Sequence, residues 1–181
     1  MLVIAFDQTV PLVKALKSAG IDTHKLYMTD SNTVDHSADF EAGLLEGSTG
    51  TIPGAHPAED FQKRMQSINA KVNDFTYAAE TYDAVTLAAL AAEKGGSADA
   101  STVSKNLMAV SGSTGGEQCS TYKDCLALIK ANKEITYRGL SGAGTFNKDH
   151  DPQTASIGVY KYDADNKPVF DHAQEGEVPN K

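Results

Sequence analysis

The start of the chain alternates apolar runs with a helical repeat. Residues 2–6 are continuously apolar, as expected of a strand that is buried on both faces. Apolar positions then recur at three-residue steps over residues 9–19, which predicts a helix that Gly20 ends. A second short strand is predicted at residues 25–28, with the polar residues 29–32 directly behind it. This order is typical of a parallel α/β sheet.

Helical patterns dominate the middle of the chain. Residues 33–56 are loop-rich and contain one short strand near residues 47–53. A helix follows, marked by Phe61, Met65 and Ile68. The longest helix is predicted over residues 74–94, with an apolar face formed by Ala78, Tyr82, Val85 and Ala89. Two more helices are expected within residues 99–130.

The last elements predicted along the chain form a β-hairpin. Residues 155–162 predict a strand, residues 163–166 predict a tight turn, and Pro168 limits the returning strand to a sheet edge. The residues after Phe170 are predicted to form a frayed tail. Together these elements predict an α/β fold of parallel sheets flanked by helices.

Composition narrows the classes of function. Hydrophobic residues make up 40% of the 181 residues, enough for a sizeable core, and the net charge is −8. An acidic chain has no general affinity for nucleic acid or for an anionic membrane. No apolar run approaches the roughly 20 residues of a membrane span. The opening residues are too short for a signal peptide, so an export signal is expected upstream.

The chain has two cysteines, Cys119 and Cys125. Zinc needs four ligands at closer spacing and a thioredoxin-like site needs Cys-x-x-Cys, so neither is predicted. The alternatives that remain are a short-loop disulfide and two unrelated thiols. We favour the disulfide because the two residues are close in sequence. A disulfide implies an oxidising compartment outside the cytoplasm.

Other polar clusters lack the spacing that chemistry requires. The Gly/Ser/Thr loop at residues 111–116 is not a phosphate-binding loop, and Ser141 does not lie in a G-x-S-x-G turn. Residues 149–151 lack the alternating ligands of a calcium loop, and the five histidines are scattered. The sequence therefore predicts no catalytic residue, no metal site and no cofactor.

Polar residues follow both of the first two predicted strands. Asp7 and Asp30 each come just after a strand, and in open α/β sheets ligands bind in the crevice beyond these strand ends. An aspartate there can pair with the ammonium group of a ligand, and Phe6 can supply an apolar wall. Both aspartates also suit an ordinary turn or helix cap.

Four segments carry a family resemblance: VIAFDQTVPLVKALKSAGI, LYMTDSN, FTYAAETYDAVTLAALAAEKGG and GLSGAGTFNKDHDPQTASIGVYKYDADNKPV. Through them the chain resembles the C-terminal half of type I periplasmic binding proteins, specifically the branched-chain amino-acid receptor group. The resemblance implies two α/β lobes joined by hinge crossovers. Residues 1–75 would belong to the C-terminal lobe and residues 76–153 to the N-terminal lobe. Residues 154–181 would form a crossover strand, a hairpin of the C-terminal lobe and a tail.

The resemblance also implies ligand contacts. Asp30, or Thr29 beside it, matches an acidic residue that binds the ligand's α-ammonium group. Phe6, with Asp7 beside it, matches an aromatic contact, and Tyr77 matches a second one at the lobe crossover. The first half of the family's fold, with the Ser/Thr-rich loops that usually hold the ligand's carboxylate, is expected to lie outside these residues.

For function, the resemblance implies the extracytoplasmic substrate-binding component of an ABC importer. Its lobes would close on a small amino-acid-like solute, such as a branched-chain amino acid, an amide, urea or an aromatic acid. The expected partners are this solute and the membrane permease, with no nucleic acid. The expected location is the periplasm, or the cell surface as a lipoprotein in a Gram-positive host. The alternative is an extracellular ligand-sensing domain of a receptor; an enzyme is not favoured.

Overall fold

The structure, a computed structural model, describes residues 1–3, 6–142 and 145–177. The chain divides into two compact units. Unit 1 comprises Met1–Pro53 and Ile157–Gln174, and unit 2 comprises Gly54–Ser156 and the chain from Glu175 onward. Each unit has its own hydrophobic core, as independent folded bodies do.

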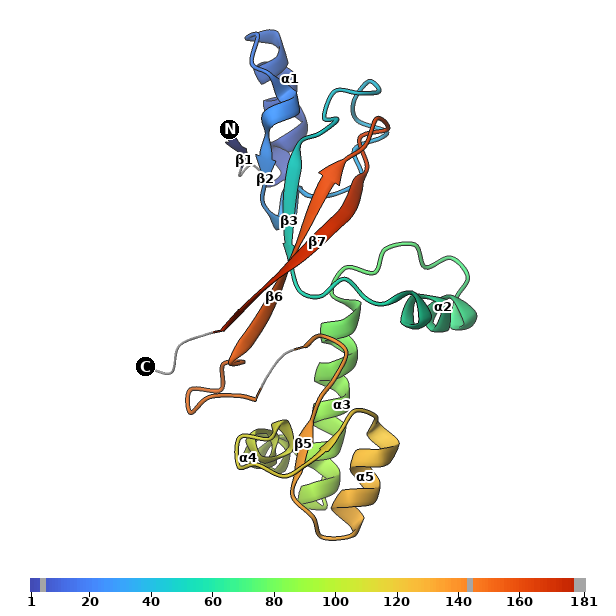
Figure 1. The fold of residues 1–181 in the computed structure, drawn as a ribbon, viewed down its shortest axis with the longest axis vertical. Helices are drawn as coiled ribbons and strands as arrows, with labels where there is room; N and C mark the ends of the chain where they lie inside the picture. Colours follow the sequence, from blue (N-terminus) through green and yellow to red (C-terminus); the bar gives the residue numbers. More distant parts are fainter. Residues whose placement is uncertain (4–5, 143–144, 178–181) are drawn as a thin grey trace. The chain divides into compact units, whose positions relative to one another are not determined.

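Unit 1 is built on a mixed five-stranded sheet (Figure 1). Three short strands run parallel: β1 (Leu2–Val3), β2 (Tyr27–Met28) and β3 (Thr49–Pro53). The hairpin of β6 (Thr154–Tyr162) and β7 (Pro168–Glu177) completes the sheet, with β6 antiparallel to β3 and β7 at the edge. The order β1–β2–β3–β6–β7 confirms the predicted parallel strands and the predicted edge hairpin.

Helix α1 (Thr9–Ser18) packs on the parallel strands. Its buried Val13 joins Val3 of β1 and Met28 of β2 in the core of unit 1. The other buried members of this core are Leu26, Phe40, Leu44, Leu45 and Tyr162. Gly20 follows the helix at φ 74°, the left-handed conformation that commonly ends helices, as predicted.

The first strand is shorter than the apolar run that predicted it. β1 ends at Val3, and Phe6 opens a 3₁₀ turn, η1 (Phe6–Gln8), that leads into α1. Residues 4–5 lie outside the described residues. The φ of Phe6 is 43°, which no strand contains, because the chain must turn here to bring α1 back over the sheet. The prediction of a strand through Phe6 is therefore wrong.

The loop between β2 and β3 is held by the turn of the β6–β7 hairpin. Asn166 in that turn is 0% exposed, and its amide oxygen accepts the Leu45 N–H at 2.9 Å. Its amide nitrogen donates to the Glu41 carbonyl at 2.8 Å. These bonds satisfy loop backbone that would otherwise be buried unpaired, and so allow the loop to fill the core with Phe40, Leu44 and Leu45.

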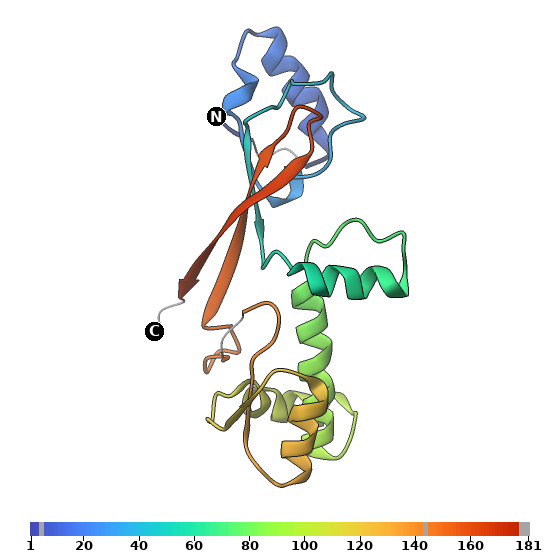
Figure 2. The same ribbon diagram turned by 45° about the vertical axis from the view of Figure 1, so that its right-hand side comes forward.

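Unit 2 is mainly helical (Figures 1 and 2). Its helices are α2 (Glu59–Ile68), α3 (Ala78–Gly95), α4 (Ala100–Ser111) and α5 (Tyr122–Lys130). Both α4 and α5 pack on α3. Two short strands, β4 (Glu117–Cys119) and β5 (Ile135–Tyr137), form a separate parallel pair. The core of unit 2 comprises Leu90, Ala91, Val110, Cys119, Cys125, Ile135 and Tyr137.

The buried face of α3 differs from the predicted one. The helix begins at Ala78 and buries Ala79, Asp83, Thr86, Leu90 and Ala91, whereas Val85 is 66% exposed. The prediction is wrong because the alanine-rich run gives little contrast between faces. An aspartate in such a run is also normally counted as a surface residue.

Three further segments depart from the sequence analysis. Strands β4 and β5 were not predicted, because three residues are too few to show a strand period. The tail predicted after Phe170 is wrong for residues 171–177, which continue β7. All seven of these residues are exposed, and an edge strand can carry polar side chains in solvent. Residues 178–181 lie outside the described residues.

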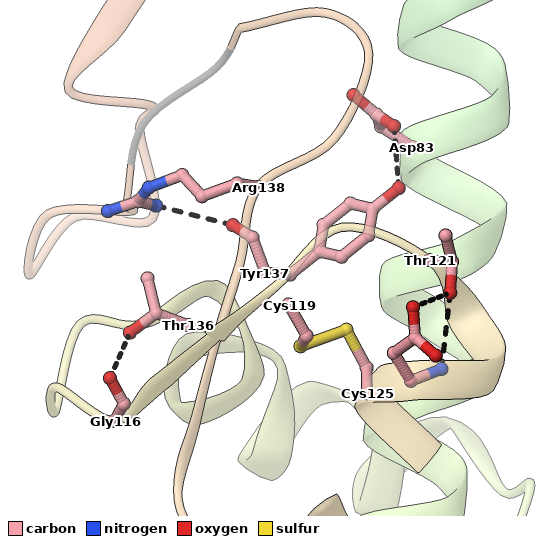
Figure 3. The surroundings of a disulfide bond; sticks show 9 residues. Asp83, Gly116, Cys119, Thr121, Cys125, Thr136, Tyr137 and Arg138 are labelled. Carbon is pink, nitrogen blue, oxygen red and sulfur yellow. Dashed lines mark hydrogen bonds between the residues drawn. A yellow bond between two sulfur atoms is a disulfide. The ribbon is translucent and has the colours of Figure 1, made fainter. Parts of the chain in front are cut away.

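A disulfide joins Cys119, at the end of β4, to Cys125, in the first turn of α5 (Figure 3). The two Cα atoms are 5.3 Å apart, within the usual range for this bond. Of the two alternatives that the sequence left open, the structure has the disulfide. Closing so short a loop stabilises the folded state by about 2–3 kcal/mol.

Candidate functional site

Four of the predicted ligand residues lie at one edge of the unit 1 sheet. β1 and β2 are adjacent and parallel, so the residues that follow them emerge at the same edge. Phe6 and Asp7 lie in η1 after β1. Thr29 follows β2, and Asp30 opens the next 3₁₀ turn, η3 (Asp30–Asn32). We call this edge, formed by residues 6–9 and 29–33, the strand-end site.

Phe6 presents an aromatic ring to solvent in a strained backbone conformation. Its side chain is 68% exposed, and its φ of 43° is a value that bulky residues rarely adopt. The Thr9 hydroxyl donates to the Phe6 carbonyl at 2.6 Å and so helps to fix this turn. Asp7 is exposed next to it. An exposed aromatic ring on a strained turn is typical of functional sites, because strain persists only where the surroundings enforce it.

Asp30 is held on an ordered turn with its carboxylate exposed. Thr29 precedes it as the N-terminal cap residue of η3. The Thr33 hydroxyl donates to the Thr29 carbonyl at 2.8 Å and closes the turn. This geometry lets Asp30 pair with a cationic group that approaches the sheet edge.

Tyr77 belongs to unit 2, unlike the other four candidates. It precedes α3 as the cap residue, with a φ of 57° and 43% of its side chain exposed. The Thr81 N–H donates to its carbonyl at 2.9 Å, which starts the helix. Phe6 and Tyr77 therefore share two properties: both are exposed aromatic residues, and both have a left-handed backbone at the start of a helical segment.

The residues that hold the strand-end site were missed by the sequence analysis. Asn32, at the end of η3, is 0% exposed, and Tyr162 of β6 is 2% exposed. The Tyr162 hydroxyl donates to the carbonyls of Asn32 and Val34, both at 3.1 Å. No signal in a single sequence separates a buried asparagine in a polar turn from an exposed one, because both suit the turn equally well.

A second polar cluster surrounds Asp83 in unit 2, and Figure 3 shows its hydrogen bond with Tyr137. Asp83 is 6% exposed; its Oδ1 accepts from the Tyr137 hydroxyl at 2.8 Å and from the Leu140 N–H at 3.0 Å. Its Oδ2 accepts from the Ser141 N–H at 2.7 Å. A small cavity beside it is lined by Asp83, Leu87, Ser111, Tyr137, Gly139, Ser141 and Phe146. These donors tie α3 to the last residue of β5 and to the segment that follows it, which is a structural role.

Two buried tyrosines predict a loss of stability in alkali. Burial raises the pKa of Tyr162 above its ordinary value, and burial together with the Asp83 hydrogen bond raises the pKa of Tyr137. The folded state therefore holds both phenol protons more tightly than the unfolded state does. This stabilisation is fully present below the unfolded pKa of about 10 and is lost as the pH rises above it.

We expect the urea midpoint of the chain to fall as the pH rises from about 9 to about 11, with a shallower fall in Tyr162→Phe. Tyr27→Phe is the control, because it removes a phenol that is 44% exposed. If the urea midpoint of Tyr162→Phe fell as steeply with pH as that of the wild type, this expectation would be contradicted.

Within residues 1–3, 6–142 and 145–177, no three His, Cys, Asp or Glu side chains are grouped to hold a metal ion. In the same part of the chain, no helix is both long enough and apolar enough to cross a membrane.

The fold is similar to that of a solved leucine-binding protein, LivK from Thermotoga maritima. The TM-score is 0.62 at 15% sequence identity, and the alignment covers 93% of this chain and 42% of that protein. The chain therefore spans less than half the length of LivK. The sequence matches no protein-family profile and no curated protein. At this identity the similarity establishes the fold alone: the chain has the predicted α/β fold, which matches part of a type I periplasmic-binding-protein-like fold.

Proposed function

We propose that this chain is the C-terminal part of an extracytoplasmic solute-binding protein and supplies one wall of its ligand cleft. The observation that carries the proposal is the strand-end site, where an exposed aromatic ring and an exposed carboxylate follow two adjacent parallel strands. Ligands of open α/β sheets bind at this edge. The similarity of the fold to that of a leucine-binding protein also supports the proposal.

The proposal assigns each part of the chain to a lobe. Residues 1–75 belong to the C-terminal lobe, and residues 76–153 return to the N-terminal lobe. Residues 154–181 provide a crossover strand, a hairpin of the C-terminal lobe and a tail. The lobes close when the solute binds, because the solute contacts both lobes only in the closed state and so favours it.

The ligand contacts follow from the chemistry of the side chains. Asp30 pairs with the α-ammonium group of a small amino-acid-like solute, and Thr29 offers a hydroxyl beside it. Phe6 forms an apolar wall, and Asp7 adds negative charge to the same edge. Tyr77 is the second aromatic side chain that we propose as a ligand contact. The protein captures and releases the solute without catalysis and without a cofactor.

The proposed partner is the permease of an ABC importer, which receives the solute from the closed protein. The proposed location is outside the cytoplasm, either in the periplasm or on the cell surface as a lipoprotein. The Cys119–Cys125 disulfide supports this location, because disulfides persist in oxidising compartments.

A thermal-shift screen of the full-length gene product tests the proposal. L-leucine, acetamide, urea and benzoate are the first probes. A solute that binds the folded state raises the melting temperature, and the rise grows with the logarithm of its concentration. Asp30→Asn, which keeps the size of the side chain and removes the charge, is expected to weaken the binding of L-leucine about 100-fold.

The matched control for Asp30→Asn is Asp165→Asn, which removes an exposed carboxylate in the β6–β7 turn of the same unit. Isothermal titration of both variants should show a loss of affinity in Asp30→Asn alone. Wild-type affinity in Asp30→Asn would count against the strand-end site, and no response to any small amino-acid-like solute would count against the function.

A further inference from the structure

Asn32 is a buried polar side chain at the point where the two candidate segments meet. It is 0% exposed, although it closes a short polar turn at the sheet edge. A buried amide is retained only where it is fully hydrogen-bonded, because an unpaired polar group loses its bonds to water without compensation. The hydrogen bonds of the Asn32 side chain therefore show which parts of the site it holds in place.

The side-chain amide of Asn32 links both halves of the strand-end site. In the orientation that satisfies its neighbours, the amide nitrogen donates to the Val3 carbonyl at 3.2 Å and to Thr29 Oγ1 at 2.8 Å. The amide oxygen accepts the Phe6 N–H at 3.0 Å and also lies 2.5 Å from Thr9 Oγ1, whose single hydroxyl proton it shares with the Phe6 carbonyl. One side chain thus connects the end of β1, the start of α1 and the end of β2.

The backbone of Asn32 is fixed from the opposite side. Its carbonyl accepts the Tyr162 hydroxyl at 3.1 Å, and His36 Nε2 lies 3.2 Å from the same oxygen. Tyr162 itself is anchored in the core of unit 1. Asn32 therefore fixes the turn that carries Asp30 to the core of unit 1.

The strained backbone of Phe6 depends on the same contacts. Asn32 holds the N–H of Phe6, and Thr9 Oγ1 holds its carbonyl at 2.6 Å. A left-handed phenylalanine persists only while such bonds favour it over an extended backbone. Loss of the amide would let Phe6 and the Asp30 turn move independently of each other.

We infer that Asn32 is a positioning residue for solute binding: it holds the Phe6 ring and the Asp30 carboxylate in the arrangement that the solute requires. This inference rests on the proposed function. Asn32 does not contact the solute; it raises affinity by keeping the binding-competent arrangement populated in the free protein.

Isothermal titration of the full-length gene product with L-leucine, acetamide, urea and benzoate tests this inference, at a temperature where every variant is folded. Asn32→Ala is expected to weaken the affinity about tenfold, since a tenfold fall in the competent population weakens the apparent affinity by the same factor. The matched control is Asn166→Ala, because Asn166 is also a 0% exposed asparagine of unit 1 that bonds to loop backbone. It should lower the melting temperature without changing affinity.

A double-mutant cycle adds a readout that a purely structural residue would not move. In an Asp30→Asn background, Asn32→Ala should cost less affinity than it does in the wild type, because its effect passes through the Asp30 turn. If Asn32→Ala does not fold, Asn32→Asp replaces it, since a carboxylate accepts from the Phe6 N–H but cannot donate to the Val3 carbonyl.

The outcomes separate the inference from the function on which it rests. Wild-type affinity in a folded Asn32 variant, together with weakened binding in Asp30→Asn, overturns the role of Asn32 alone. An equal loss of affinity in Asn32→Ala and Asn166→Ala also overturns it, because general destabilisation would explain both. A wild-type protein that binds none of the four probes overturns the inference and counts against the proposed function.

Discussion

Asp83→Ala is expected to lower the free energy of unfolding by about 3–5 kcal/mol, because each of the three donors left without an acceptor costs about 1 kcal/mol or more. The carboxylate is 6% exposed and accepts from the Tyr137 hydroxyl and from two backbone N–H groups, those of Leu140 and Ser141. Alanine would leave all three without this acceptor. Gly139 lies so close to the carboxylate that a Cβ there would overlap it, which shows how tightly the chain wraps Asp83.

Urea unfolding of the chain, followed by the helical circular-dichroism signal, measures the effect of Asp83→Ala. Tyr137→Phe is the graded control: it removes one donor and keeps both backbone bonds, so it should cost about 1 kcal/mol. A cost for Asp83→Ala no larger than that of Tyr137→Phe would show that the backbone bonds contribute little.

Asn166→Ala is expected to cost about 3 kcal/mol, from two sources. The first is the buried N–H of Leu45, which loses the amide oxygen that accepts it at 2.9 Å. The second is the backbone of residue 166, whose φ of 60° is unfavourable for alanine and acceptable for asparagine. Because Asn166 anchors the loop that carries Phe40 and Leu45 into the core, the loss is expected to appear as a lower free energy of unfolding of unit 1.

Asn166→Gly separates the two sources. Glycine adopts the left-handed conformation without strain but makes no side-chain hydrogen bond, so it should be about 1 kcal/mol more stable than Asn166→Ala. Urea unfolding of the two variants beside the wild type gives both values. If the alanine and glycine variants were equally stable, the left-handed backbone of residue 166 would contribute nothing to the cost. If both variants had the urea midpoint of the wild type, the side-chain hydrogen bonds of Asn166 would contribute nothing either.

Much of the fold of unit 1 can be predicted from sequence because its signals are local and unambiguous. The apolar runs before Asp7 and Thr29, the glycine after α1 and the turn before Pro168 each mark the end of one element. Short connections then limit the topology to parallel strands with a helix between them. Phe6 was placed in the strand because its side chain is apolar, while its backbone is set by the turn into α1.

Unit 2 is less predictable because its signals depend on tertiary contacts. On α3, Val85 was placed on the predicted apolar face but is 66% exposed, whereas Asp83, which lies outside that predicted face, is buried. Asp83 is buried because Tyr137 of β5 and the segment after β5 bring three donors to it, and a window of sequence around α3 does not contain that information. The three-residue strands β4 and β5 likewise form through pairing with each other.

The strand-end site could be located in part. Asp7 and Asp30 were predicted as ligand residues because ligands bind beyond the carboxyl ends of parallel strands, a rule that needs only the order of the elements, and the structure places both residues at that edge. Asn32 was not found, because its role depends on the side-by-side position of β1 and β2 and on Tyr162, which lies far away in the sequence.

A crystal structure of the full-length gene product with a bound solute tests the central claim most directly. The account predicts that the ammonium group of an amino-acid-like solute lies within hydrogen-bonding distance of Asp30 or Thr29, with the Phe6 ring against its apolar part. A solute bound away from residues 6–9 and 29–33 would contradict the account.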